Sequence, residues 1–570
     1  MEQIDHSVEF CVVGGGLAGM CAAITAARHG IKTLLMHERP VLGGNASSEV
    51  RMWVCGTPRR LETGIVEEIR LENLYRNTHP NYSVWDSILY EKVRFQENLT
   101  LLLNCSCQEL ECEEGRIKSI RGYQQTTQQF HRVEARFFAD CSGDSILAPL
   151  SGAEFRVGRE AKSEFGEQLG QDKPDSKTMG LSCILQARET GSPKKFIPPK
   201  WAYCYPDEAS LPPRGHQYCR TQNFWYLELG GDRDSIRDTE EIRDELLKIA
   251  FGLWDHIKNH GDHGAENWTL DWVGFLPGKR ESRRYMGDYI LTEKDILSGA
   301  FFEDAIAYGG WPVDDHHPGG FNHFGPANIH ISVPAPYTIP LRSIYSRNIS
   351  NLFCAGRNIS TTHVALSSSR VMATCAILGQ AAGTAVYHAI KENCATNREA
   401  AQKYFKDIQQ TLLDDDCHLP GLKREIPAIC RRAALSASQG EPELLRNGVE
   451  RAIGSEENCW KCRAGDSAEY TLPEAADMKE IRIVFDSDLS RDHLNMVSNY
   501  TLEGEIYTPP ATLVTAFHVE ADGEELFRDS GNYQRLIVIP CGRKVQKLKL
   551  VIDAVADSSG EAKVFRFDFK

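Results

Sequence analysis

The stretch that most restricts the fold of this chain is "VEFCVVGGGLAGMCAAITAARHGIKTLLMHE", residues 8–38. It reads as an apolar strand, a Gly-x-Gly-x-x-Gly turn, an alanine-rich helix, a second strand and an acidic residue. Gly14 permits the tight turn, Gly16 lets the backbone approach a pyrophosphate, and Gly19 lets the helix pack closely on the strand. Glu38 follows where a carboxylate can accept hydrogen bonds from ribose hydroxyls. The stretch therefore predicts a βαβ unit that binds a dinucleotide at the helix N-terminus.

Bulk composition excludes several classes of protein. With 570 residues, the chain is expected to form two or three domains. Its net charge of −15 opposes binding to nucleic acid or to anionic membranes. No apolar run approaches the ~18 residues of a membrane span. The N-terminal residues lack the pattern of a signal peptide, so we expect a cytoplasmic protein whose 18 cysteines are thiols.

Further stretches carry a family resemblance. They are "RPVLGGNASSEVRMWVCG" (residues 39–56), "FFADCSGDSILAPLSGAEFRVGRE" (137–160), "PGKRESRRYMGDYILTEKDI" (277–296), "YGGWPVDDHH" (308–317) and "NISNLFCAGRNISTTHVALSSSRVMATCAILGQAAGTA" (348–385). Together they resemble the bacterial FAD-dependent oxidoreductase family, a branch of the glutathione-reductase-like flavoproteins. The resemblance implies bound FAD and a Rossmann-like α/β fold.

The resemblance and the strand patterns together predict the domain organisation. The FAD-binding domain comprises residues 1–155 and 336–400, and an α+β substrate or cap domain is inserted at 156–335. A helical connector, 401–445, leads to an antiparallel β-sandwich at 446–570. Alternating apolar residues and an Asp-Gly turn signal predict the sandwich, which loosely resembles galactose-binding jelly rolls.

The resemblance implies a set of cofactor-binding residues. A helix that begins near Ser367 is expected to direct its N-terminal dipole at the flavin. The expected cofactor contacts are Gly14, Gly16, Leu17, Ala18, Gly19, Glu38, Arg39, Gly43, Gly44, Asn45, Ala46, Ser47, Arg51, Asp144, Gly356, Arg357 and Val371.

Candidate catalytic residues come from segments expected to lie near the flavin ring. Oxidation of a carbon that bears a hydroxyl needs a base, and the pKa of histidine suits that role. We expect the stretch from Tyr308 to Phe324 to form a loop that covers the ring. The catalytic candidates are His363, Asp315, His316 and His317, and the substrate-binding candidates are Trp53, Trp311, Arg342 and Arg370.

These residues predict an FAD-dependent dehydrogenase or oxidase that takes hydride from a CH–OH group of a sugar, cyclitol or glycoside, in carbohydrate metabolism. A fumarate-reductase-like or desaturating enzyme acting on CH–CH is the first alternative, and it would need convergent arginines. A flavin-binding protein without turnover is the second. The partners expected are a small-molecule substrate and an unidentified electron acceptor, and a homo-oligomer is an open alternative.

The sequence disfavours three other roles. A metal at Asp315, His316, His317 and His323 is a rival hypothesis, but no metal is predicted because strong sites show spaced ligands on regular elements. A disulfide reductase is disfavoured because such an enzyme needs a pair of cysteines after the second glycine pair, and only one, Cys55, is present there. The Cys-x-x-Cys pair that ends at Cys462 is interpreted as two structural thiols.

Within the cap, residues 223–232 are expected to form an aromatic strand, and residues 239–261 an amphipathic helix. The prediction puts His256 and His260 at the solvated end of that helix, and His323 and His330 in structural roles. The "RESRR" motif (280–284) predicts an ion-pair network that ties the insertion to the flavin domain, with anion binding as the alternative.

Overall fold

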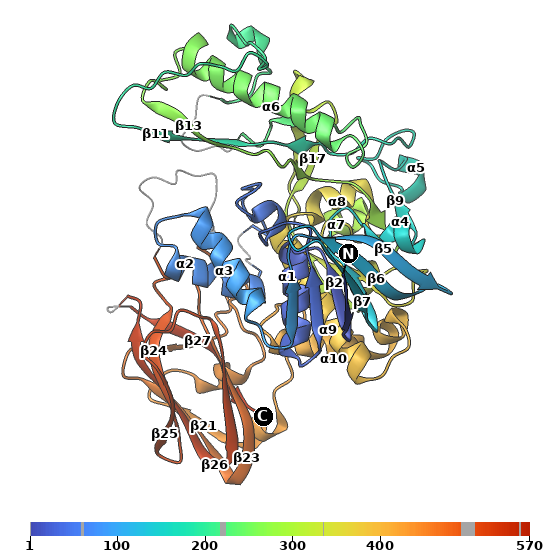
Figure 1. The fold of residues 1–570 in the computed structure, drawn as a ribbon. Coiled ribbons are helices and arrows are strands. Elements are labelled where there is room, and N and C mark those ends of the chain that lie inside the picture. The colour runs from blue at the N-terminus through green and yellow to red at the C-terminus, as the bar shows by residue number, and fades with distance from the viewer. Residues whose placement is uncertain (1, 59–61, 217–223, 335, 492–507, 558–559) are drawn as a thin grey trace. The chain divides into compact units, whose positions relative to one another are not determined.

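The computed structural model describes residues 2–58, 62–216, 224–334, 336–491, 508–557 and 560–570. The chain forms two compact units (Figure 1). Of the described residues, the first unit comprises 2–57 and those between 79 and 408, and the second comprises 58, 62–78, 409–491, 508–557 and 560–570.

A five-stranded parallel sheet lies at the centre of the first unit, in the order β20-β8-β2-β3-β4. Every residue of β2 and β3 is buried, which explains their uninterrupted apolar sequences. The βαβ unit predicted from the glycine motif is present as β2, α1 and β3. The element bounds are β2 (Phe10–Val13), α1 (Leu17–Arg28), β3 (Thr33–Met36), β4 (Leu99–Leu102), β8 (Phe137–Asp140) and β20 (Leu352–Cys354).

Helix α9 (Met372–Lys391) packs directly on α1 (Figure 1). Two glycines make this approach possible. A Cβ at Gly379 would lie 1.9 Å from the carbonyl oxygen of Ala18, and one at Gly383 would lie 2.4 Å from that of Ala22. The close contact places the first turns of both helices at the carboxyl edge of the sheet, where ligands bind in open α/β folds.

A second sheet and several short elements lie in the same unit as the parallel sheet. The sheet has the order β1-β7-β6-β5. The bounds are β1 (Gln3–Ser7), β5 (Cys105–Glu113), β6 (Arg116–Gln124), β7 (Gln129–Glu134), η1 (Gly44–Ala46), α3 (Tyr82–Arg94), α4 (Leu147–Ser151) and α8 (His363–Ser369).

The chain between β8 and β20, which contains the predicted cap, forms several small sheets, one of which contacts helix α6. Ile242, Leu246, Leu253 and Ile257, from the predicted apolar face, are all buried. The bounds are β9 (Phe155–Arg156), α5 (Lys162–Phe165), β10 (Leu181–Ser182), β11 (Leu185–Glu189), η2 (Glu208–Ser210), β12 (Glu228–Leu229), α6 (Thr239–Asp255), η3 (His256–His260), β13 (Trp268–Val273), β14 (Gly278–Lys279), β15 (Arg284–Tyr285), α7 (Glu293–Ser298), β16 (Ala305–Gly309), β17 (Val313–His316), η4 (Gly320–Asn322), β18 (Asn328–Ile331), β19 (Tyr337–Pro340) and η5 (Leu341–Ser343).

Three expectations for this part of the chain were wrong. The aromatic strand at 223–232 is reduced to β12, because Phe224 adopts a positive φ and a turn follows it, and Asn223 lies outside the described residues. The stretch from Tyr308 is not one loop, since it contains β17, which pairs with β18. His256 is fully buried rather than solvated.

The second unit has an antiparallel sheet in the order β22-β27-β23-β26-β24-β25, with β21 paired to β23. Asp522 and Gly523 both have positive φ and join β24 to β25, as the sequence predicts. The jelly-roll likeness of this unit stays a prediction. The bounds are α2 (Ile65–Arg76), α11 (Ala428–Arg432), β21 (Ala434–Ala437), η6 (Pro442–Arg446), β22 (Trp460–Cys462), β23 (Ser467–Phe485), β24 (Val514–Ala521), β25 (Glu524–Asp529), β26 (Leu536–Val555) and β27 (Ala562–Phe569); α10 (Asn397–Asp414) contributes to both units.

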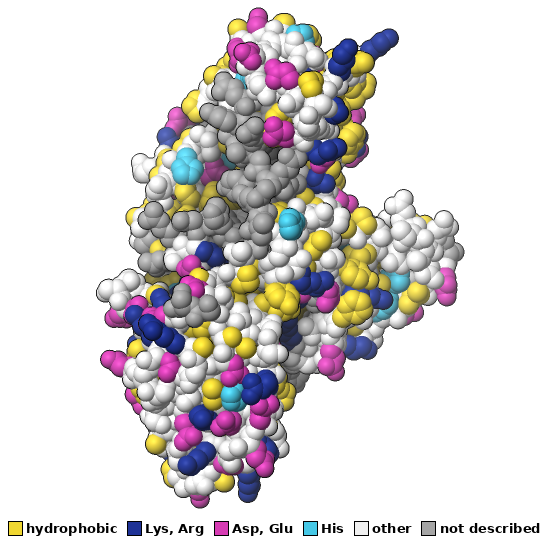
Figure 2. All heavy atoms as spheres, turned by 90° about the vertical axis from the view of Figure 1, so that its left-hand side faces the viewer, with side chains coloured by type: hydrophobic (Ala, Val, Ile, Leu, Met, Phe, Trp, Pro, Cys, Tyr) yellow, Lys and Arg dark blue, Asp and Glu magenta, His cyan; other side chains and the backbone are white. Residues whose placement is uncertain are grey.

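Among the described residues, every helix is too short or too polar to cross a lipid bilayer. On the face shown in Figure 2, Lys and Arg side chains are interspersed with Asp and Glu rather than gathered into a patch of one sign.

Candidate functional site

A cavity of about 560 Å³ lies within the first unit, at the carboxyl edge of the parallel sheet. Its volume is in the range typical of sites for small molecules and cofactors. One part of its wall is the glycine turn before α1 together with the loop after β3. The opposite part comes from the cap and from the start of α9, including Trp225, Arg280, His316 and Met372.

The glycine turn leaves room for a ligand instead of filling the cavity. Gly14 has φ +103°, and a Cβ there would clash with the backbone of Cys141 at 2.4 Å. At Gly16 the nearest atom to a Cβ is 3.9 Å away, so a side chain would project into open space. The first turn of α1 has no side-chain cap and no acidic residue. Its N–H groups are therefore available to an anion.

The loop after β3 is fixed by hydrogen bonds from His37. The N–H of Gly15 donates to Nδ1 of this histidine at 2.9 Å. Its Nε2 lies 3.0 Å from the carbonyl oxygen of Val41 and therefore carries the hydrogen. This bonding holds the loop against the glycine turn, where Gly43 N donates to Gly15 O at 2.9 Å. Glu38 and Arg39 then line the cavity beside the turn.

Asp144 follows β8 and forms an ion-pair cluster in the cavity wall. Lys279 Nζ lies 2.7 Å from its Oδ2 and Arg357 Nη2 lies 2.7 Å from its Oδ1, to which Ser282 also donates at 2.8 Å. Burial raises the pKa of Asp144, but the charges of Arg357 and Lys279 outweigh this and hold the pKa well below its usual range. The cluster joins three segments that are distant in the sequence.

Strand β17 directs alternate side chains to opposite sides, as every strand does. Asp314 and His316 line the cavity, whereas Asp315 does not. His316 Nδ1 lies 2.6 Å from Glu228 Oε2 and its Nε2 lies 3.3 Å from Asp314 Oδ2. Arg370, from the end of α8, donates to Asp314 Oδ2 at 3.0 Å. This side of the cavity is therefore rich in paired charges.

Glu228 is buried behind His316 and stays ionised. Gly180 N donates to it at 2.8 Å, and Arg280 Nη1 lies 3.3 Å from its Oε2. Burial raises the pKa of Glu228, but the charges of Arg280 and His316 outweigh this and lower the pKa. A fixed carboxylate at Nδ1 sets the orientation of the His316 ring.

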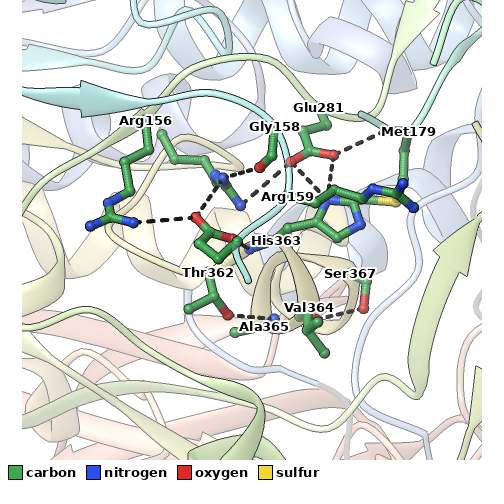
Figure 3. A network of polar contacts seen from close by, with 12 residues as sticks. Arg156, Gly158, Arg159, Met179, Glu281, Thr362, His363, Val364, Ala365 and Ser367 are labelled. Atoms are coloured by element: carbon green, nitrogen blue, oxygen red, sulfur yellow. Dashed lines mark hydrogen bonds and ion pairs between the residues drawn. The ribbon is translucent and has the colours of Figure 1, made fainter. Parts of the chain in front are cut away.

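His363 lies in a separate buried network (Figure 3). Its Nδ1 is 2.9 Å from Glu281 Oε2, and its Nε2 is 3.0 Å from Asp315 Oδ1. Its backbone N–H donates to Glu160 at 2.8 Å, and Arg284 pairs with the same Glu160 at 2.9 Å. Burial lowers the pKa of His363, but the charges of Glu281 and Asp315 raise it to about 10. The ring is therefore protonated at neutral pH with both N–H groups bound.

A family model for FAD dependent oxidoreductases matches residues 9–412. The chain belongs to this FAD-dependent oxidoreductase family. It is accordingly an FAD-dependent enzyme. No curated protein is significantly similar to the sequence.

Three solved structures illustrate the distance to known proteins. A geranylgeranyl bacteriochlorophyll reductase-like protein from Thermoplasma acidophilum is 14% identical with a TM-score of 0.30, over 72% of this chain and 84% of its own. The p-nitrophenol 4-monooxygenase from Pseudomonas putida is 13% identical with a TM-score of 0.31, over 73% and 87%. L-proline dehydrogenase from P. horikoshii is 17% identical with a TM-score of 0.17, and the match spans 25% of this chain and only 24% of that protein.

The residues of the cavity fit FAD. The uncapped start of α1 and the open space at Gly16 suit the pyrophosphate, and Glu38 suits a ribose. The first turn of α9 has no side-chain cap at Val371, and its N–H groups suit the flavin end of FAD. The cofactor candidates that line the cavity are Gly14, Gly16, Leu17, Ala18, Glu38, Arg39, Gly43, Gly44, Asn45, Asp144, Gly356, Arg357 and Val371.

Four cofactor candidates lie elsewhere. A Cβ at Gly19 would lie 1.8 Å from Gly14 O, so this glycine serves helix packing. Ala46 is buried, and Ser47 donates to the carbonyl oxygen of Gly44. Arg51 donates to Gln186 at 2.8 Å and stacks on aromatic rings. The helix expected to begin near Ser367 is also corrected, because α8 begins at His363 and the helix at the cavity is α9.

Among the other candidates, the cavity brings together His316, Trp53, Trp311 and Arg370. His363 and Asp315 belong to the buried network. His317 is exposed and stacks on His323, with ring centroids 3.6 Å apart. Arg342 pairs with Asp304 at 3.0 Å outside the cavity.

The rival metal site at Asp315, His316, His317 and His323 does not assemble in the described part of the chain. Asp315 and His316 face opposite sides of β17, and the other two rings stack on each other. Glu281 of the "RESRR" motif pairs with His363, a residue of the predicted flavin domain, at 2.9 Å, and Arg280 of the same motif lines the cavity.

Sequence reasoning missed several residues of the cavity. The prediction names Asp315 and not Asp314, because it expects a loop. In a loop, neighbouring side chains do not alternate between two faces. His330 lies opposite Asp314 across the strand pair and lines the cavity. Lys279, which lines the cavity, lies in the stretch 277–296, and Glu228, which lies behind His316, belongs to the expected aromatic strand; neither is among the predicted site residues. The alternation "VDDH" could have indicated a strand with Asp314 and His316 on one face.

Proposed function

We propose that this enzyme oxidises a hydroxyl-bearing carbon of a small polar substrate, with His316 as the group that accepts the hydroxyl proton. The position of His316 carries the proposal. It lines the cavity, its Nδ1 is bound to the ionised Glu228, and its Nε2 makes only a 3.3 Å contact with Asp314. When bound, FAD supplies the acceptor for the hydride that leaves the substrate carbon.

The contrast between the two histidine candidates supports this choice. His363 is held between two carboxylates at 2.9 and 3.0 Å, is protonated at neutral pH and does not line the cavity. A base must have a free lone pair within reach of the proton. We therefore assign His363 to positioning, because it fixes Asp315 and so the face that β17 presents.

Two N–H donors at the cavity support a substrate that is rich in oxygen. Trp311 Nε1 and Arg370 Nε are buried and have no hydrogen-bond partner among the described residues. Both residues line the cavity. Buried donors without partners are costly, so a ligand oxygen would relieve them. With Trp53 and Trp225 as further aromatic walls, a sugar, cyclitol or glycoside is the substrate class that fits best.

A second reaction class has one specific observation in its favour. Arg280 and Arg370 both line the cavity, as an enzyme acting on CH–CH next to a carboxylate would need. Each already pairs with a carboxylate, Glu228 at 3.3 Å and Asp314 at 3.0 Å, which weakens their claim on an anionic substrate. Oxidation of CH–OH is therefore preferred.

The test is anaerobic mixing of the FAD-loaded enzyme with candidate polyols, followed by flavin absorbance. We expect at least one polyol to bleach the wild-type enzyme, and His316→Gln to slow this by about 10²–10⁴-fold with FAD retained. His317→Gln is the matched control, since this exposed neighbour should leave the rate unchanged. Bleaching of His316→Gln at the wild-type rate would refute the assignment of the base. If unsaturated carboxylates reoxidise the dithionite-reduced enzyme and no polyol bleaches it, the CH–CH alternative is correct.

A further inference from the structure

Four side chains of the cap converge on one point away from the cavity. Glu208, His216, His256 and His263 each direct one potential ligand atom at this point, and these atoms all lie within 4.8 Å of one another. None of the four lines the cavity. The three histidine side chains are almost fully buried, with at most 5% exposed, whereas that of Glu208 is 62% exposed. Nothing in the proposed reaction uses them.

The separations match the corners of a small coordination shell. His256 Nε2 and His263 Nε2 are 3.1 Å apart. Glu208 Oε1 is 3.3 Å from His216 Nε2, 3.4 Å from His256 Nε2 and 3.5 Å from His263 Nε2. A tetrahedral zinc ion with bonds of about 2.0–2.1 Å places its ligand atoms roughly 3.3 Å apart.

The hydrogen bonds behind the rings show which nitrogens face the centre as lone pairs. His216 Nδ1 lies 2.9 Å from the carbonyl oxygen of Arg214, and His256 Nδ1 lies 2.8 Å from that of Tyr205. A carbonyl oxygen only accepts, so both Nδ1 atoms carry hydrogen. In the neutral rings the Nε2 lone pairs then point at each other and at the Glu208 carboxylate. A metal cation at the centre would satisfy these lone pairs, and this is how metal-bound histidines are oriented in proteins.

The backbone at the cluster is unusual. Helix α6 ends at Asp255, and residues His256–His260 continue it as a π-helix. Short π-helical segments are rare and often occur at functional sites. Here the segment begins at His256, the only fully buried residue of the four. Glu208 comes from η2, His216 from the segment after it, His256 from the start of the π-helix and His263 from the chain after its end.

We propose that Glu208, His216, His256 and His263 bind one zinc ion that stabilises the cap. Three imidazole nitrogens and one carboxylate suit zinc and related transition metals, whereas calcium and magnesium prefer oxygen ligands alone. All four tetrahedral positions are filled by the protein and the cavity is separate, so the ion is structural. It fastens the segment around η2 to the end of α6, across a long intervening stretch of chain.

A second group lies beside the first and provides the control. Cys204, Asp255 and His260 also come close enough to share an ion, but Cys204 and His260 are exposed. His260 Nε2 is already 3.1 Å from Asp255 Oδ2, which accounts for its position without a metal. His260→Gln is therefore the matched control for substitutions at the proposed site.

The experiment measures zinc in the full-length FAD-loaded enzyme after growth with zinc and extensive dialysis. We expect about one zinc per chain by mass spectrometry, with nitrogen and oxygen ligands at about 2.0–2.1 Å and no sulfur by X-ray absorption. His256→Gln should lose the zinc and His260→Gln should keep it. Since His256 is buried, the exposed Glu208→Gln serves as the variant that folds, and its zinc affinity should fall at least about tenfold.

Two outcomes would overturn the proposal. One is zinc that persists in both His256→Gln and Glu208→Gln, or that shows sulfur ligands, which would place the ion elsewhere. The other is protein without zinc whose melting temperature neither added zinc nor a chelator changes. In that case the four side chains only hydrogen-bond to one another, and no ion is bound.

Discussion

At the scale of single residues, the cavity is defined as much by missing side chains as by present ones. Gly16 is the clearest example, because a Cβ there would meet no protein atom closer than 3.9 Å. We expect the cofactor to occupy this open space. This separates the role of Gly16 from that of Gly14, where any side chain would clash with the chain itself.

Gly16→Val should therefore give folded protein that does not bind FAD. The added side chain extends into the space in which the pyrophosphate would approach the start of α1. Flavin absorbance of the purified protein measures the loss, and circular dichroism checks the fold. Gly191→Val is the control, since a Cβ at that exposed glycine meets nothing within 4 Å. A yellow Gly16→Val protein with a normal FAD content would contradict the assignment.

The buried ion pairs of His363 predict how stability depends on pH. The folded-state pKa of about 10 lies above the usual value near 6.5, so the protonated ring stabilises the fold fully below about pH 6.5. The contribution is lost as the pH rises through about 10, with a slope of up to about 1.4 kcal/mol per pH unit. Urea unfolding from pH 6.5 to 10 measures the slope, and His363→Gln should reduce it. An equal slope in both proteins would show that another group titrates.

At the scale of elements, β17 illustrates what the sequence could and could not predict. The βαβ unit, the Asp-Gly hairpin and the apolar face of α6 were predicted correctly because each depends on local periodicity or turn chemistry. The polar composition of the stretch "VDDHH" favours a loop, whereas the structure has a strand there. Its pairing partner, β18, follows only after an intervening turn, so the pairing is a tertiary fact that local propensity does not contain.

The opposite directions of two neighbouring aspartates in β17 give a sharp test. Asp314→Asn should slow flavin reduction by substrate more than it lowers the melting temperature, since Asp314 lines the cavity, although it also pairs with Arg370. Asp315→Asn should lower the melting temperature more than it slows reduction, because it leaves His363 with one ion-pair partner fewer. Stopped-flow absorbance and thermal melting separate the two. The reverse pattern would mean that Asp315, and not Asp314, faces the cavity.

The contact between α1 and α9 couples helix packing to cofactor binding. Gly379→Ala places a Cβ 1.9 Å from the carbonyl oxygen of Ala18, so the helices must separate. Overpacking of this kind costs about 1–3 kcal/mol. Because both helices begin at the cavity, FAD affinity should fall together with the free energy of unfolding, which a flavin titration and urea unfolding measure. Unchanged affinity in a destabilised variant would show that the helix starts move independently of this contact.

At the scale of the whole molecule, the chain forms two compact units, and each has a hydrophobic core of its own. All residues that line the cavity belong to the first unit. In the second unit, the sheet of β21 to β27 encloses large buried side chains such as Trp460, Tyr470, Phe517 and Phe567. The sequence predicted this antiparallel sheet from its alternating pattern. It did not predict that residues 62–78 belong to the second unit, because such an association leaves no local signal.

Cofactor binding should therefore stabilise the two units unequally. A ligand that binds only the folded first unit stabilises that unit against opening. A separate core is stabilised only as far as its unfolding is coupled to that of the first unit. Hydrogen exchange of the FAD-free and FAD-loaded enzyme measures this difference. We expect strong protection by FAD in β2, α1 and the first turns of α9, and little change in β23 and β26. Protection of equal size in β23 and β26 would show that the chain unfolds as one cooperative body, and that the boundary near Ile408 has no energetic meaning.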